Sequence, residues 1–170
     1  MDELKFAVIG NPVSHSLSPD IHLFFASQFQ LERYTYNKIK SNENDFERDI
    51  NDFFKNGGVG LNVTVPFKGL AYNLCDELDQ SAGLCKSVNT VLIDSGKLIG
   101  HSTDGQGLID DFLHKEITLE DSKILIIGAG GSAASIISSL LFHGKIKEIS
   151  ILNRTKSNAL RLLDLFETNR

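Results

Sequence analysis

The chain has 170 residues, of which 41% are hydrophobic and 23% are charged, and its formal net charge is −5 at pH 7. This length allows one domain or one domain and a fraction, and the composition is typical of a folded globular protein. The negative charge argues against nonspecific nucleic-acid binding, because that activity requires a basic surface.

Targeting and metal signals are also missing from the sequence. No apolar run approaches the ~20 residues that a membrane helix needs, and residues 1–5 do not have the layout of a signal peptide. The two cysteines, Cys75 and Cys85, do not form a CxxC pair and do not have the spacing of zinc ligands. We therefore expect a cytoplasmic protein with free thiols, no metal, and no membrane or nucleic-acid partner.

The first 65 residues alternate between strand and helix patterns. Gly10-Asn11-Pro12 ends the first strand, and Ser18 with Pro19 is a typical helix start in which the serine hydroxyl caps the helix. The expected elements are a strand at 4–9, a helix from Ser18, a strand at 33–40, an amphipathic helix at 43–55 and a strand at 59–65. This order predicts a parallel sheet with right-handed crossovers.

The middle of the chain has shorter elements. We expect two short helices within 66–85 and a hairpin in which strands at 87–93 and 97–102 flank the turn at 94–96. A further helix is expected to begin near Asp104, and a polar connection follows at 115–122. This connection marks the start of a second structural unit.

The second unit opens with an apolar strand at 123–127, which is expected to be buried on both faces, and then a glycine-rich loop and a helix. In this context, a GxGG loop is typical of dinucleotide sites, because glycines admit the pyrophosphate and the helix N-terminus supplies N–H groups. The alternative is a packing turn without a ligand. The candidate cofactor-binding residues are Gly128, Ala129, Gly130, Gly131, Ser132 and Ala133.

A basic turn follows the next expected strand, at 148–152. NAD sites usually have an acidic residue at this point, to bind the ribose 2′-hydroxyl. An arginine and a lysine instead suit a 2′-phosphate, so NADP is favoured over NAD. The alternative is a solvated basic cluster at a helix start. The candidate residues of this turn are Asn153, Arg154, Thr155 and Lys156.

Several polar side chains follow or lie on the strands of the first sheet. Ser16 and Ser18 lie in the loop after the first strand, where ligands bind in open α/β sheets, and both could donate to a carboxylate. Asn62 and Thr64 share one face of the third strand because side chains alternate, and Asn89 begins another strand. Each residue alone could be structural, but together they predict a polar pocket.

A lysine and an aspartate suggest the chemistry of this pocket. Pro66 ends the strand run and Lys68 follows two residues later, and Asp104 lies in a second polar loop. Delivered from separate loops, the two can form one acid–base pair. The alternatives are a solvated lysine at a helix start and an aspartate that caps a helix.

The motifs SLSP, NVTVPFK, VNT, TDG, GAGGSA and NRT occur in the order and spacing of the shikimate dehydrogenase family, which the chain resembles over almost its whole length. The resemblance implies reversible, NADPH-dependent reduction of 3-dehydroshikimate to shikimate, a step in chorismate and aromatic amino acid biosynthesis. It implies that Lys68 and Asp104 form the catalytic pair. The substrate-binding residues that it implies are Ser16, Ser18, Asn62, Thr64, Lys68, Asn89 and Asp104.

The chain departs from the family pattern at a few positions. Ser102 stands where an asparagine often precedes TDG, and Lys86-Ser87 stands where Gly-Ala often precedes VNT. Asn158 occupies the place of a second arginine, for which Lys156 could substitute. Family members also continue for roughly another half-domain, so we expect an N-terminal part or a truncated copy.

The sequence thus predicts an α/β protein in which a mainly parallel-sheet substrate domain precedes the first part of a Rossmann-type NADP-binding domain. The expected ranges are 1–103 for the substrate-binding catalytic domain, 104–122 for a linking helix and connection, and 123–170 for the partial Rossmann domain. The alternatives are a quinate/shikimate dehydrogenase that uses NAD or NADP, and a non-catalytic module that binds shikimate. We expect a monomer or a homodimer.

Overall fold

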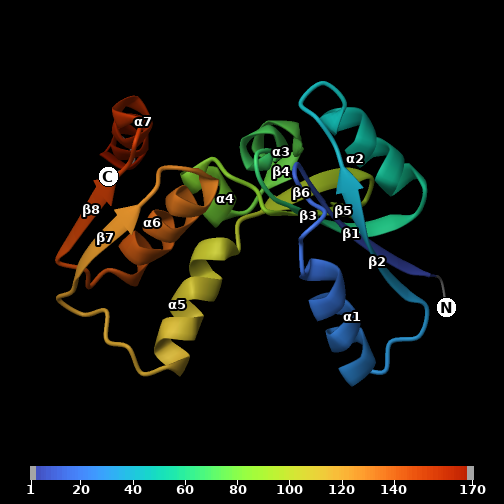
Figure 1. Ribbon diagram of the computed structural model, residues 1–170, viewed down its shortest axis with the longest axis horizontal. Helices are drawn as coiled ribbons and strands as arrows, with labels where there is room; N and C mark the ends of the chain where they lie inside the picture. Colours follow the sequence, from blue (N-terminus) through green and yellow to red (C-terminus); the bar gives the residue numbers. More distant parts are fainter. Residues whose placement is uncertain (1–2, 168–170) are drawn as a thin grey trace. The chain divides into compact units, whose positions relative to one another are not determined.

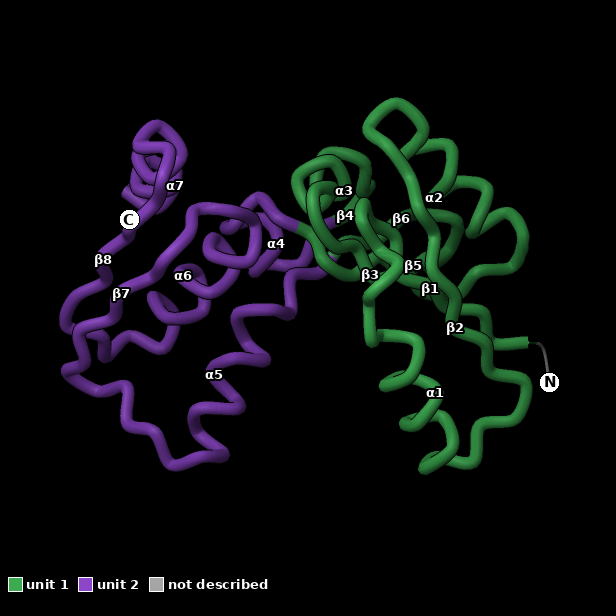
Figure 2. The backbone as a smooth tube through the Cα atoms, viewed as in Figure 1, with its two compact units in different colours: residues 1–77, 88–100 green, residues 78–87, 101–170 purple. Residues whose placement is uncertain are grey.

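The structure, a computed structural model, describes residues 3–167. They group into two compact units, as Figure 2 shows: unit 1 contains the residues up to 77 together with 88–100, and unit 2 contains 78–87 and the residues from 101 onward. The expected substrate domain was the continuous range 1–103. Residues 78–87 lie with unit 2 because Cys85 packs in an apolar cluster with Ala133, Ala134 and Ile137.

Unit 1 is built on a sheet with the strand order β2-β1-β3-β5-β6-β4. Its elements are β1 (Leu4–Gly10), α1 (Ser18–Gln28), β2 (Tyr34–Lys40), α2 (Phe46–Lys55), β3 (Gly58–Val63), α3 (Lys68–Leu74), β4 (Glu77–Leu78), β5 (Thr90–Asp94) and β6 (Lys97–His101) (Figure 1). β1 pairs in parallel with both β2 and β3, which confirms the expected parallel sheet. β5 pairs antiparallel with β3, and the short strand β4 was not expected.

The core of unit 1 fixes the start of α3. Phe46, Ile50 and Phe54 recur every four residues along α2 and are all buried, as an amphipathic helix requires. The Phe46 ring packs against Phe67, with ring centroids 4.9 Å apart, and Phe67 is 1% exposed. Because Phe67 directly precedes Lys68, packing in the core sets where α3 begins.

As far as residue 167, unit 2 contains a parallel two-stranded sheet and four helices. Its elements are α4 (Gln80–Cys85), α5 (Asp104–His114), β7 (Lys123–Ile127), α6 (Gly131–His143), β8 (Glu148–Leu152) and α7 (Lys156–Glu167). β7 and β8 pair over their full lengths, from Lys123 with Glu148 to Ile127 with Leu152. A strand, the glycine loop, a helix and a parallel strand in this order confirm the expected first part of a Rossmann unit.

The sheet of unit 2 is packed on one face only. Ile124 and Ile126 contact the apolar clusters formed with α5 and α6. On the opposite face Leu125, Ile127 and Leu152 are 59%, 78% and 57% exposed. The prediction that the 123–127 strand is buried on both faces was therefore wrong for the described residues. None of the helices in residues 3–167 combines the length and the apolar character that a membrane span requires.

The uncovered face of β7 and β8 is expected to drive self-association. Exposed apolar sheet faces and unpaired strand edges promote contacts between chains. We expect the apparent mass from light scattering to rise with concentration for the wild-type chain and to rise less for Leu125→Lys. Leu70→Lys, at an exposed apolar position on α3, is the matched control. A wild-type chain that is monomeric at every concentration would contradict this prediction.

Candidate functional site

The loop before α1 places two serine hydroxyls together. The Ser16 hydroxyl donates to Ser18 Oγ at 3.1 Å, and the Ser18 N–H donates to Ser16 Oγ at 3.3 Å. Leu17, rather than Ser18, is the residue that precedes the helix, and no side chain caps it. The prediction that Ser18 caps α1 was therefore wrong. As the first helical residue, Ser18 instead places its hydroxyl beside that of Ser16. It also interacts with the phenol of Tyr36, whose pKa it lowers.

Tyr36 on β2 connects this loop to β3. Its side chain is 5% exposed, and its hydroxyl donates to Asn62 Oδ1 at 2.7 Å. The ring stacks on His22 with the centroids 4.4 Å apart and an angle of 15° between the planes. Sequence reasoning missed Tyr36 because a tyrosine in a strand is commonly a core residue. The signal was strand parity: Tyr36 pairs with Phe6 and Asn62 with Val8, so both side chains lie on one face.

Burial keeps the Tyr36 phenol neutral. Desolvation by burial raises the pKa of Tyr36 to about 12, although the hydrogen bond with Ser18 acts in the opposite direction. Burial also lowers the pKa of His22, which stacks on the ring. Desolvation disfavours the charged form of each group. The raised pKa therefore keeps the phenol protonated, and able to donate a hydrogen bond, further into the alkaline range than an exposed tyrosine.

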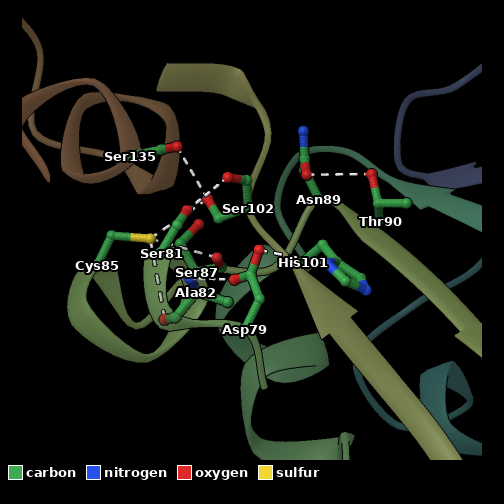
Figure 3. A network of polar contacts seen from close by, with 10 residues as sticks. All are labelled: Asp79, Ser81, Ala82, Cys85, Ser87, Asn89, Thr90, His101, Ser102 and Ser135. Atoms are coloured by element: carbon green, nitrogen blue, oxygen red, sulfur yellow. Dashed lines mark hydrogen bonds and ion pairs between the residues drawn. The ribbon is translucent and has the colours of Figure 1, made fainter. Parts of the chain in front are cut away.

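The amide of Asn62 is held at both ends. Its oxygen accepts from Tyr36, while its Nδ2 donates to Thr90 Oγ1 at 3.2 Å and to the carbonyl of Asn89 at 3.4 Å. The Thr90 hydroxyl in turn donates to Asn89 Oδ1 at 3.1 Å (Figure 3). Tyr36, Asn62, Asn89 and Thr90 therefore belong to one hydrogen-bonded network. The Ser16–Ser18 pair lies beside it, since Ser18 influences the Tyr36 phenol. Thr90 belongs to the VNT motif but was not singled out by sequence reasoning, and Tyr36 lies outside the motifs.

Thr64 and Lys68 lie on the backbone turn that follows β3. The N–H of Thr64 donates to the carbonyl of Ile9 at 2.9 Å, and its carbonyl accepts from the N–H of Phe67 at 3.0 Å. Lys68 is the first residue of α3, and its carbonyl accepts from the N–H of Val88 at 3.0 Å. These bonds fix the backbone of both residues relative to β1 and to the segment that leads into Asn89.

Asp104 lies in unit 2 at the start of α5. Thr103 is the residue that precedes the helix, so Asp104 is its first helical residue. The alternative interpretation of Asp104 as a capping residue was therefore wrong. Its Oδ2 accepts from the Ser132 hydroxyl at 3.0 Å. This bond joins the carboxylate to the helix that begins at the glycine loop.

The glycine loop leaves open space in front of α6. Gly128 has a φ of +122°, a conformation that favours glycine, and a Cβ at Gly128 or Gly130 would meet no atom within 4 Å. Gly130 precedes the helix without a side-chain cap. The 13-residue helix α6 therefore presents its positive N-terminal end to this open space. The loop has space for a pyrophosphate group, a type of group that helix N-termini commonly bind.

The basic turn follows β8 beside this loop. The N–H of Gly128 donates to the carbonyl of Leu152 at 2.8 Å, so the glycine loop is bonded to the end of β8. Asn153 Nδ2 donates to the carbonyl of Thr155 at 2.8 Å and closes the turn. Arg154 and Lys156 are exposed. Neighbouring parallel strands thus place a phosphate-type loop and two cations at the same sheet edge. In residues 3–167 no group of three or more His, Cys, Asp or Glu side chains could hold a metal ion.

Two family models match successive parts of the chain. Residues 8–91 match the shikimate dehydrogenase substrate binding domain, and residues 112–170 match shikimate / quinate 5-dehydrogenase. The chain belongs to the shikimate dehydrogenase family. This finding confirms the resemblance inferred from the motifs between SLSP and NRT.

Individual relatives support the same assignment. The NADP(+) shikimate dehydrogenase of Acinetobacter baylyi is 43% identical over 159 residues, which are 94% of this chain and 60% of that protein. The shikimate 5-dehydrogenase of Thermus thermophilus in complex with NADP(H) and shikimate has a TM-score of 0.87 at 31% identity, over 96% of this chain and 61% of that one. The Listeria monocytogenes enzyme with shikimate and NAD has a TM-score of 0.86 at 31% identity, over 98% and 58%. The chain thus spans about 60% of the length of the relatives that it matches.

The raised pKa of Tyr36 predicts a loss of stability in alkali. An unfolded tyrosine ionises near pH ~10, whereas the folded one does so near 12. The unfolded state therefore loses its proton first, and the free energy of unfolding falls as the pH rises from the lower value through the higher one. Urea denaturation between pH 8 and pH 11 should show this fall for wild type and a smaller fall for Tyr36→Phe. If the free energy of unfolding depends on pH identically in the two proteins, the raised pKa of Tyr36 would be contradicted.

Proposed function

We propose that this chain carries the substrate site, the catalytic pair and the first part of the cofactor site of an NADP-dependent shikimate dehydrogenase. The reaction is the reversible reduction of 3-dehydroshikimate to shikimate, in the cytoplasm, by a monomer or homodimer. The observation that carries the proposal is the half-buried polar network in unit 1. It occurs in a chain that belongs to the shikimate dehydrogenase family. In that network Tyr36 and Thr90 hold Asn62 and Asn89, and the paired hydroxyls of Ser16 and Ser18 lie beside Tyr36.

The polar groups of unit 1 suit the substrate. Shikimate carries a carboxylate and several hydroxyls on one ring. Ser16 and Ser18 supply adjacent hydroxyl donors for the carboxylate. Asn62, Thr64 and Asn89 supply amide and hydroxyl groups for the ring hydroxyls. Because Tyr36 and Thr90 already hold the Asn62 amide, binding would require little further ordering of that side chain.

Lys68 and Asp104 are the proposed acid–base pair. Bound NADPH would supply a hydride to the ketone carbon. Lys68, as an ammonium, would stabilise the negative charge that develops on the ketone oxygen and give that oxygen its proton. Asp104 would accept a hydrogen bond from a substrate hydroxyl and orient the lysine. This pairing rests on the match of NVTVPFK and TDG to the family's motifs.

NADP is the proposed cofactor. The open glycine loop at the N-terminus of α6 suits the pyrophosphate, and the exposed side chains of Arg154 and Lys156 suit a 2′-phosphate. A second candidate is a quinate/shikimate dehydrogenase that also uses NAD, since the Listeria monocytogenes relative is described in complex with shikimate and NAD. Arg154 favours NADP because guanidinium binds phosphate groups strongly. Turnover of shikimate and quinate with each cofactor separates these candidates.

A separate titration of shikimate and NADP by calorimetry tests whether the chain is more than a binding module. We expect both ligands to bind. We expect Arg154→Ala to weaken NADP binding about 10-fold or more, which is the scale for losing a hydrogen bond to a charged group. NAD and shikimate affinities should not change in this variant. If the wild-type chain binds shikimate but neither binds NADP nor oxidises shikimate, the result would support the non-catalytic module instead.

Lys68 is the residue on which turnover should depend most directly. In a complete enzyme that contains this chain, Lys68→Ala should lower kcat by about 10²-fold or more, the usual scale for losing a general acid–base group. Steady-state rates with shikimate and NADP would measure the change. Lys55→Ala, at the exposed end of α2, should retain the wild-type rate. Near-normal turnover in Lys68→Ala would exclude the proposed role.

A further inference from the structure

Helix α6 holds the start of helix α5 at two points. Ser132 donates its hydroxyl to Asp104 Oδ2 at 3.0 Å, and Ser135 Oγ accepts from the N–H of Gly105, also at 3.0 Å. Residues three apart lie on the same face of a helix, so one face of α6 contacts both the side chain of Asp104 and the next backbone amide.

Ser135 supplies a cap that α5 does not provide for itself. The first N–H groups of a helix have no acceptor within the helix, and a preceding polar side chain commonly supplies one. Thr103 precedes α5 without making such a bond. Ser135, which is 1% exposed, provides the acceptor from another helix. Because buried N–H groups need a partner, this bond ties the first turn of α5 to α6.

The residue before Thr103 is tied to the same hydroxyl. Ser102, which is 4% exposed, donates to Ser135 Oγ at 2.8 Å and accepts from the thiol of Cys85 at 3.3 Å, as Figure 3 shows. Ser102 is one of the positions where the chain departs from the common family motif. Its short hydroxyl allows the contact with Ser135, so the segments on both sides of Thr103 depend on one oxygen atom.

Gly105 allows the two helices to approach closely. A Cβ at this position would collide with the backbone carbonyl of Ser135 and with the Ser139 hydroxyl. Any other residue would therefore push α5 away from α6 and lengthen the bond from the Gly105 N–H to Ser135. Asp104 is thus placed by the helix that begins at the glycine loop.

We propose that Ser135 is a positioning residue for Asp104: its buried hydroxyl holds the first turn of α5 so that the carboxylate can meet the substrate. The inference rests on the proposed function, in which Asp104 contacts a hydroxyl of shikimate. It adds a residue that touches neither substrate nor cofactor. It also makes the helix of the glycine loop the support for a substrate-binding carboxylate.

The test is a double-mutant cycle on shikimate affinity, measured by NMR titration of the chain. Ser135→Ala should weaken shikimate binding by about threefold to tenfold, the scale for one lost hydrogen bond. In an Asp104→Ala background, the same substitution should cause no further loss, because the residue acts through Asp104. Ser138→Ala, on the same helix and 3% exposed, is the matched control and should leave the affinity unchanged.

The contrary results are distinct. An equal loss in both backgrounds would mean that Ser135 only stabilises the fold, and unchanged affinity in Ser135→Ala would also overturn the proposal. If Ser135→Ala does not fold in a thermal melt, Ser102→Ala, which removes one of the two bonds to the same oxygen, enters the cycle. A loss that disappears with Asp104→Ala would again support the proposal, and one that persists would overturn it.

A second measurement separates this inference from the proposed function. If the wild-type chain does not bind shikimate, the proposed function fails, and the Asp104 carboxyl ¹³C resonance and hydrogen exchange of the Gly105 amide then decide the inference. Ser135→Ala should shift that resonance and accelerate that exchange, whereas Ser138→Ala should do neither. Unchanged signals in Ser135→Ala would overturn the positioning role independently of any ligand.

Discussion

The hydrogen bond from the Tyr36 hydroxyl to Asn62 is the interaction on which the polar half of unit 1 depends. It crosses from β2 to β3 on one face of the sheet, and Ser18 at the start of α1 influences the same phenol. Buried polar groups are costly unless they are satisfied, so these groups constrain one another. The result is a set of hydroxyl and amide groups whose orientation is settled before any ligand arrives, which is the condition for tight and selective binding.

Unit 2 uses one helix for two tasks. The N-terminus of α6 faces the open space at the glycine loop, while Ser132 and Ser135 hold the beginning of α5. Substitutions on this helix can therefore affect the proposed phosphate site and the position of Asp104 at once. In the proposed enzyme, this arrangement would link the position of Asp104 to the element that binds the cofactor, without a separate connecting segment.

Much of the fold could be predicted from local patterns. The strand at 123–127, the amphipathic helix of α2 and the turn at 94–96 were confirmed, because periodicity and turn chemistry are local properties. The capping interpretations of Ser18 and Asp104 were wrong because each helix begins at that residue, so the cap position is one residue earlier. Sequence patterns do not place a helix boundary to within one residue. Burial on both faces of β7 was also wrong, since burial depends on which elements cover the sheet.

The sequence by itself determined the order of elements, the chemistry available at each strand end and the family, because motifs such as NVTVPFK and GAGGSA are read from neighbouring residues. Only the tertiary structure decided which polar groups meet. Neither Tyr36 nor Ser135 belongs to one of the motifs, yet each forms a hydrogen bond with a group on another element. The physical reason is that a hydrogen bond between distant segments depends on strand register and helix packing, and neither is encoded in the spacing of the residues that it joins.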